Sequence, residues 1–141
     1  MITTQSAVGL AVTGDQLIDR FERGETPLES FHHADHVRLA FEYLARYPVL
    51  DALEKFSTAL KRFAAAKGKS GLYHETITWA FLFLIRERMA RAGHEPSWEE
   101  FADHNPDLLV FRGGILDRLY TKETLESPFA RSTFVLPGQS A

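Results

Sequence analysis

The segment that decides the fold reads Tyr73-His74-Glu75-Thr76-Ile77-Thr78-Trp79-Ala80-Phe81-Leu82-Phe83-Leu84-Ile85. Its second half is seven consecutive apolar residues, inside a stretch from Tyr73 to Ala92 that is long enough for about five helical turns. A helix that is apolar on every side is normally buried at the centre of a bundle. The run is too short for a membrane span, which needs about 20 apolar residues, and Arg86 follows it directly. We therefore predict a central buried helix whose first turn carries polar side chains.

Length and composition predict one soluble domain covering residues 1–141, because 45% hydrophobic and 25% charged residues are ordinary for a globular chain. A net charge of −3 argues against a nucleic-acid partner, which usually requires a basic face. The absence of cysteine excludes disulfides, thiolate zinc sites and cysteine nucleophiles. The chain begins without the basic and apolar regions of a signal peptide. We expect a cytoplasmic protein with no membrane partner.

Three further helices, of which the first is short, precede the central one, and their apolar residues recur at spacings of three and four. Thr13 and Gln16 form a capping box that begins a helix over about 13–23. The next two helices are predicted over about 33–47 and 49–66, separated by Pro48 and ended by Gly68 as a C-terminal cap. Residues 1–12 are predicted to form an N-terminal arm.

The C-terminal third predicts only short pieces of helix, because glycine and proline interrupt it repeatedly. We expect them at about 97–104, 107–111, 115–120 and 122–126. Residues 129–136 fit either a helix or an extended segment, and 138–141 form a tail. The predicted fold is all-α: a helical bundle of about four main helices with short irregular C-terminal helices.

Three histidines are predicted to meet at one end of this bundle. Short loops between consecutive helices favour antiparallel neighbours, so the helices that begin near His33 and His74 should start at the same end. His33 and His36 begin the apolar stripe of the first of these helices. The topology alone therefore predicts one layer that contains His33, His36 and His74.

Such a cluster has the composition of a metal site. Histidines three positions apart on a helix have neighbouring Cβ atoms, about 5–6 Å apart, so both imidazoles can reach one ion. A third imidazole, from His74, would complete a three-histidine site with an open position, which is typical of catalytic zinc. Imidazole also suits iron, copper and nickel, so the sequence predicts a divalent metal without identifying it.

Residues beside His74 are candidates for supporting roles. Glu75 points about 100° away from His74 if the helix is regular, so we predict that it is either a fourth metal ligand or a general base. Tyr73 and Thr78 are the candidates for contacting a substrate, because Thr78 follows His74 by one turn and Tyr73 lies at the helix mouth.

Two interpretations without metal use the same residues. Two helix N-termini that face one cavity favour an anion, so the histidines could line a site for a small anionic or aromatic ligand. Alternatively, a network of histidine, glutamate and threonine side chains could simply hold the two helices together. His32 lies off the apolar stripe and is predicted to be exposed.

The motifs resemble those of a family of small, uncharacterised, all-α bacterial proteins. The resemblance rests on four pieces that span most of the chain: Phe31-x-His33-x-x-His36-Val37-Arg38-Leu39-Ala40, Tyr73-His74-Glu75-Thr76-x-Thr78, Asn105-Pro106-Asp107-Leu108 and Ser127-x-x-Ala130-Arg131-x-x-Phe134-Val135-x-Pro137. It implies an all-α fold and selects His33 rather than His32 as the motif histidine, but it implies no activity. Relatives often carry an acidic residue where this chain has Gly138.

The leading functional hypothesis is a metal-dependent enzyme that acts on a small molecule. The ion would activate bound water or a substrate at its open position, which leaves hydrolysis, isomerisation and oxygen chemistry as alternatives. The second hypothesis is a non-enzymatic module that binds a small ligand in the same cavity. The third is a structural or dimerisation protein, a homodimer that uses its aromatic-rich C-terminal segment.

Overall fold

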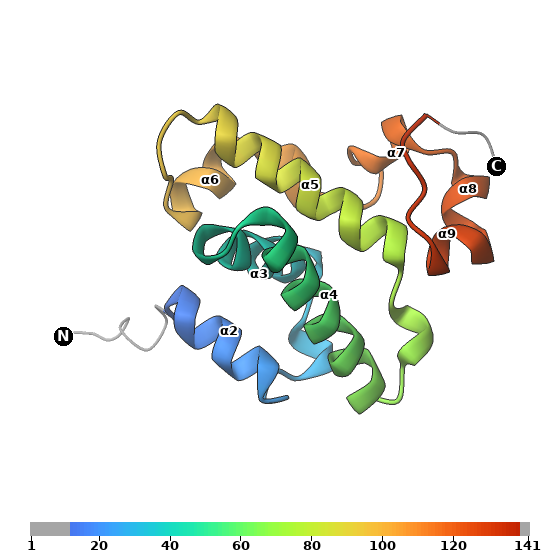
Figure 1. Ribbon diagram of the computed structural model, residues 1–141, viewed down its shortest axis with the longest axis horizontal. Coiled ribbons are helices and arrows are strands. Elements are labelled where there is room, and N and C mark those ends of the chain that lie inside the picture. Colours follow the sequence, from blue (N-terminus) through green and yellow to red (C-terminus); the bar gives the residue numbers. More distant parts are fainter. Residues whose placement is uncertain (1–11, 139–141) are drawn as a thin grey trace.

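The computed structural model describes residues 12–138 and shows an all-α protein (Figure 1). No strand occurs in this part of the chain. The predicted arm and tail lie outside the described residues, apart from Val12 and Gly138. None of the helices within 12–138 combines the length and the apolar character that crossing a membrane would require.

The four main helices and the short C-terminal helices are confirmed. Their bounds are α2 (Gly14–Glu22), α3 (His33–Arg46), α4 (Val49–Ala66), α5 (Glu75–Arg91), α6 (Trp98–His104), α7 (Leu116–Leu119), α8 (Lys122–Glu126) and α9 (Pro128–Ser132), with 3-10 turns η2 (Leu28–Ser30), η3 (Ser70–Leu72) and η4 (Pro106–Leu109). The central helix begins at Glu75 rather than Tyr73, because His74 is its N-cap. The segment 129–136, left open by its sequence, is helical only to Ser132.

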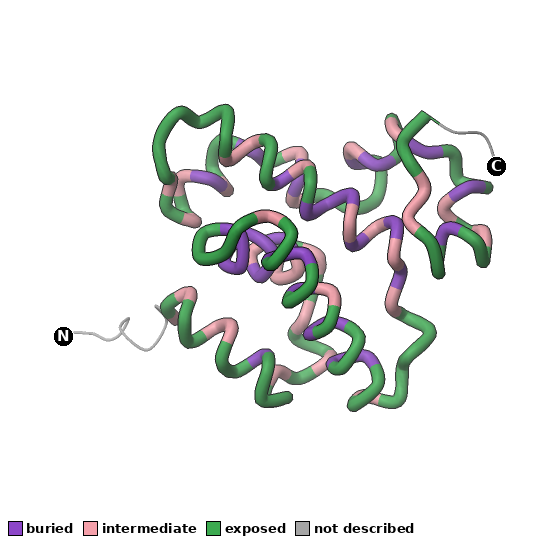
Figure 2. The backbone as a smooth tube through the Cα atoms, viewed as in Figure 1, coloured by how far each residue is buried: buried purple, intermediate pink, exposed green. Residues whose placement is uncertain are grey.

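The middle of helix α5 is apolar because it lies between two cores. On one side it packs against α3 and α4, and on the other against α9 (Figure 1). Leu82 and Ile85 belong to the larger core, whereas Ala80 and Phe81 belong to a smaller core beneath the C-terminal helices. Figure 2 shows buried positions along much of α5, which agrees with this arrangement. Within the apolar run Phe83 is the exposed residue, at 37%.

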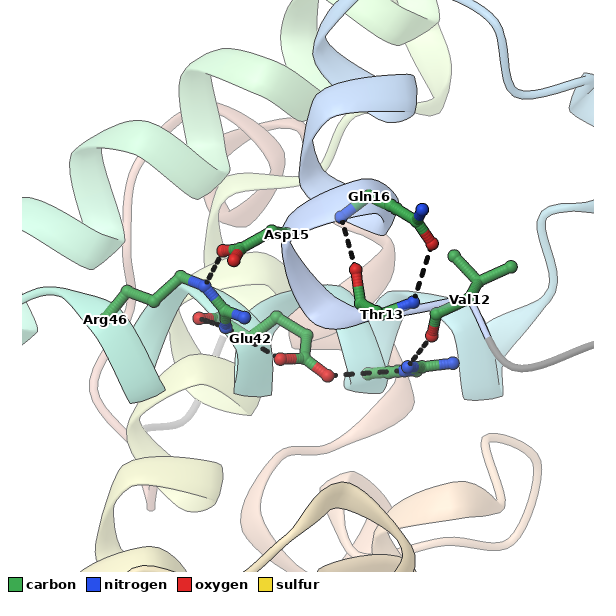
Figure 3. A network of polar contacts seen from close by, with 7 residues as sticks. Val12, Thr13, Asp15, Gln16, Glu42 and Arg46 are labelled. Atoms are coloured by element: carbon green, nitrogen blue, oxygen red, sulfur yellow. Dashed lines mark hydrogen bonds and ion pairs between the residues drawn. The ribbon is translucent and has the colours of Figure 1, made fainter. Parts of the chain in front are cut away.

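Helix α2 begins with the predicted capping box, which is confirmed. The Thr13 hydroxyl accepts a hydrogen bond from the Gln16 backbone N–H, and the Gln16 side chain accepts one from the Thr13 N–H (Figure 3). Gly14 follows, and a Cβ atom there would overlap the carboxylate of Glu42. Glycine thus lets the start of α2 approach α3 closely.

Two arginines of α3, both paired with the buried carboxylate of Glu42, connect α3 to the start of α2. Glu42 accepts hydrogen bonds from Arg38 at 3.3 Å and from Arg46 at 2.7 Å, which is the i,i+4 spacing on one helix face (Figure 3). Arg46 also pairs with Asp15 at 2.6 Å, and Arg38 donates to the Val12 carbonyl at 2.8 Å. A buried charge is tolerated when it is paired in this way. The network holds the start of α2 on α3, away from the histidines.

Candidate functional site

A cavity of about 360 Å³ lies between α3, α4 and α5, a size within the range of small-molecule sites. Its walls are apolar and largely aromatic, with a few polar groups: Leu28, Phe31, His33, His36, Val37, Phe56, Leu60, Phe63, Ala64, Leu72, Tyr73, His74, Ile77, Thr78, Phe81 and Phe111. No lysine, arginine, aspartate or glutamate of the described chain lines it. All three predicted histidines, with Tyr73 and Thr78, do line it.

His36 is the cavity histidine whose ring is packed against an aromatic neighbour but not hydrogen-bonded within the described chain. Its imidazole packs on Phe31, with ring centroids 4.2 Å apart, and forms no hydrogen bond to any residue between 12 and 138. Burial lowers the pKa of His36 to about 4; neighbouring His33 lowers it as well, and Asp35 opposes the shift. At neutral pH the ring is uncharged, with one nitrogen that donates and one that accepts.

His33 is held in one tautomer by the backbone. Its Nε2 lies 2.9 Å from the Leu108 carbonyl, and because a carbonyl only accepts, Nε2 carries the proton. Nδ1 of the neutral ring is therefore an acceptor. The ring packs edge-on against Phe81 and tilted against Phe111, with centroids 4.7 and 5.3 Å away. Burial lowers the pKa of His33, and the bond to Leu108 opposes that shift.

The carbonyl that holds His33 comes from the Asn105-Pro106-Asp107-Leu108 segment, which forms η4. Arg88 on α5 donates two hydrogen bonds to Asp107, at 2.7 and 3.0 Å, and one to Asn105 at 2.8 Å. The hydrogen bond from Arg88 lowers the pKa of Asp107. This motif, which is remote from His33 in the sequence, therefore positions His33 through the Leu108 carbonyl. The spacing of its residues does not predict this role.

His74 is occupied on both ring nitrogens. As N-cap of α5 it accepts a hydrogen bond at Nδ1 from the Ile77 N–H at 3.1 Å. Its Nε2 therefore carries the proton and donates to the Leu125 carbonyl at 2.7 Å. Burial lowers the pKa of His74, Arg131 lowers it further, and the bond to Leu125 opposes both. The ring thus joins α5 to the end of α8.

The predicted three-histidine centre is not assembled. Among residues 12–138, no three histidine or carboxylate side chains are placed to hold one ion together. The reason is the crossing of α3 and α5: His33 rests on Phe81, six positions after Glu75 and about 9 Å along the helix axis. His33 and His74 also donate to carbonyls of different segments. The N-termini of α3 and α5 share a cavity without bringing their imidazoles to one point.

Glu75 does not take the predicted place beside a histidine. It accepts a hydrogen bond from the Tyr73 hydroxyl at 2.6 Å and is absent from the cavity wall within the described chain. Burial raises the pKa of Tyr73, and Glu75 raises it further; the hydroxyls of Thr78 and Ser57 lower it less. Tyr73 thus presents its phenol to Glu75, while Thr78 stays at the cavity wall as a small polar group.

Thr76, a motif residue that was not predicted to be a site residue, joins α5 to the C-terminal segment. Its fully buried hydroxyl lies 2.7 Å from the Ala130 carbonyl and 2.9 Å from that of Thr133, and accepts from the Val135 N–H at 3.1 Å. Arg131 donates to the Gly71 carbonyl at 2.6 Å. The His74 and Thr76 side chains of the Tyr73–Thr78 motif therefore attach the C-terminal helices to α5.

No family model matches this chain, and neither a curated protein nor a solved structure is significantly similar to it. Of the predicted family resemblance, the structure confirms that this is a small all-α protein.

Proposed function

We propose that this protein binds a small uncharged molecule with an aromatic body in the cavity between α3, α4 and α5. The observation that carries the proposal is His36, a neutral imidazole whose ring has no hydrogen-bond partner among the described residues, placed in a largely apolar wall. His36 is partly exposed, so solvent can reach its ring, and a molecule that displaces this solvent must offer a hydrogen-bond partner in its place. A bound molecule would supply that partner.

The wall also supports a choice of ligand class. The described residues place no cation or carboxylate there to balance a charge, and moving an unpaired charge out of water into this cavity is costly. Aromatic rings favour tilted or edge-on contacts with another ring. The supported ligand has an aromatic or similarly flat apolar body and one hydrogen-bonding group directed at His36.

Binding can be tested with 2-naphthol, uncharged naphthalene and anionic 2-naphthoate as probes, followed by fluorescence titration at pH 7. We expect 2-naphthol to bind most tightly, and 2-naphthoate to bind about tenfold or more weakly because its charge must be desolvated. In His36→Phe the preference for naphthol over naphthalene should fall by about tenfold, the value of one hydrogen bond. His32→Phe, which changes an exposed histidine of the same segment, is the matched control. Equal affinity for all three probes, or tightest binding of the anion, would contradict the proposal.

A second candidate, the metal-dependent enzyme, is favoured by the state of His33. Histidines that bind metals typically donate the N–H of one ring nitrogen to a carbonyl or carboxylate and bind the ion through the other nitrogen. His33 donates to the Leu108 carbonyl in this way, and His36 follows three positions later. A divalent ion would then have two protein ligands, with the remaining positions open to water or substrate.

This candidate predicts near-stoichiometric zinc, iron, copper or nickel in protein purified without a histidine tag. Elemental analysis measures the metal, and His36→Ala should abolish it whereas His74→Ala should keep it, because both nitrogens of His74 are occupied. Loss of metal in His74→Ala with retention in His36→Ala would reverse these roles.

The homodimer stays a separate prediction. Light scattering on the protein as it elutes from a size-exclusion column can test it.

A further inference from the structure

We infer that Phe111 controls access to the cavity and sets the size of the molecule that the cavity accepts; this inference rests on the proposed binding function. Among the lining residues of the described chain, Phe111 is the one contributed by the segment after α5. It comes from the connection between η4 and α7, whereas the other walls belong to α3, α4, α5 and the turns before them.

Phe111 has the exposure of a boundary residue. Its side chain is 46% exposed, although Phe63 and Phe81 on the inner wall are buried. Its ring packs on His33 with centroids 5.3 Å apart and on Phe81 with centroids 6.4 Å apart. One side of the ring therefore faces the cavity lining and the other faces solvent, so moving it aside would open the wall without disturbing the core.

The backbone on both sides of Phe111 is anchored. On the N-terminal side the Leu108 carbonyl is bonded to His33, and Arg88 holds Asp107. On the C-terminal side the Gly114 N–H donates to the Phe111 carbonyl, and Gly113 adopts a φ of 68° that suits glycine. With the chain held at both ends, the motion available is rotation of the side chain, which is fast for an exposed residue.

Leu72 offers a matched comparison. It also lines the cavity and is 63% exposed, but it lies on η3, and its side chain has no aromatic contact with His33. If opening depends on Phe111, shortening Leu72 should have a small effect. If the cavity is open along its whole rim, both changes should act alike.

The test measures how fast a reagent reaches His36. Diethyl pyrocarbonate acylates neutral imidazole, and mass spectrometry can compare the rate at His36 with the rate at exposed His104. We expect Phe111→Ala to accelerate acylation of His36 about tenfold relative to His104, because the ring that covers this part of the cavity wall is removed. Leu72→Ala should change it less than about twofold. Phe111→Trp, which keeps an aromatic side chain, should slow the reaction.

Unchanged acylation of His36 in Phe111→Ala, or equal acceleration in Phe111→Ala and Leu72→Ala, would overturn the inference. The acylation rate is measured without a ligand, so a failure of this inference can be told apart from a failure of the proposed binding function. In the ligand arm, association and dissociation of 2-naphthol should both quicken in Phe111→Ala, and a longer probe such as 6-phenyl-2-naphthol should gain affinity. Faster acylation without any naphthol binding would retain the access role and refute the binding function.

Discussion

Thr76→Val is expected to lower the free energy of unfolding by about 2–4 kcal/mol, because it removes the partner of the buried Ala130 carbonyl and of two further backbone groups. Valine has nearly the shape of threonine, so little packing changes. The hydroxyl that it removes accepts from the Val135 N–H and donates toward the Ala130 and Thr133 carbonyls, in a position where no solvent reaches it. Urea denaturation followed by circular dichroism measures the loss.

Thr78→Val is the matched control, since it makes the same change two positions later on the same helix. Thr78 is buried but makes no comparable bonds to the C-terminal segment of the described chain. We expect its effect to stay below about 1 kcal/mol. Amide hydrogen exchange adds a local readout: the Val135 N–H should exchange faster in Thr76→Val only. Equal destabilisation by both substitutions would show that the C-terminal attachment does not depend on Thr76.

Acidification is expected to destabilise the protein by about 3 kcal/mol through His36 alone. The pKa of His36 is about 4 in the folded protein, against 6.5 for an ordinary histidine, which represents the unfolded chain. Because the folded-state pKa is the lower one, the unfolded chain binds the proton more tightly. The stability is therefore complete above about pH 6.5 and is lost as the pH falls from 6.5 towards 4.

His33 and His74 should contribute in the same direction, since burial lowers the pKa of both. The pKa of Asp107 is also lowered, but from 3.8, so the stability from this carboxylate is lost only at more acidic pH. The histidine effect therefore occupies its own pH window.

Urea denaturation at a series of pH values between 7.5 and 4.5 measures this dependence. His36→Phe should bind about one proton fewer on unfolding in that window than the wild-type protein does. His32→Phe, at an exposed position, should keep the wild-type dependence. If His36→Phe and the wild-type protein lose stability in parallel on acidification, His36 does not carry the effect.

Which residues form helices could be predicted because helices are encoded locally. Apolar spacings of three and four predicted most of the residues that α3 and α4 bury and Phe21 in α2, but Leu50, expected to face inward, is 70% exposed. A capping box predicted the start of α2. Gly68 was expected to end α4, and it has the φ of 70° that favours glycine after a helix. The apolar run in α5 predicted burial on all sides; the two cores bury most of it, but Phe83 is exposed.

The histidines show where local information ends. Short loops were enough to place His33, His36 and His74 around one cavity, because that inference needs only the direction of consecutive helices. The distances between the rings depend on how α3 crosses α5, and this is decided by which side chains pack at the crossing. His33 packs on Phe81, six positions after the start of α5, so it shares a cavity with His74 but is too far from it to share an ion.

The sequence by itself therefore determined the helices, the buried centre and the end of the bundle where polar groups gather, because each follows from patterns within one or two consecutive elements. Only the tertiary structure decided the state of each imidazole. The Leu108 carbonyl holds His33 and the Leu125 carbonyl holds His74, across 75 and 51 positions of the chain, while His36 receives no such partner among the residues described. Backbone carbonyls are present at every residue, so no sequence pattern marks which of them will accept from a given ring.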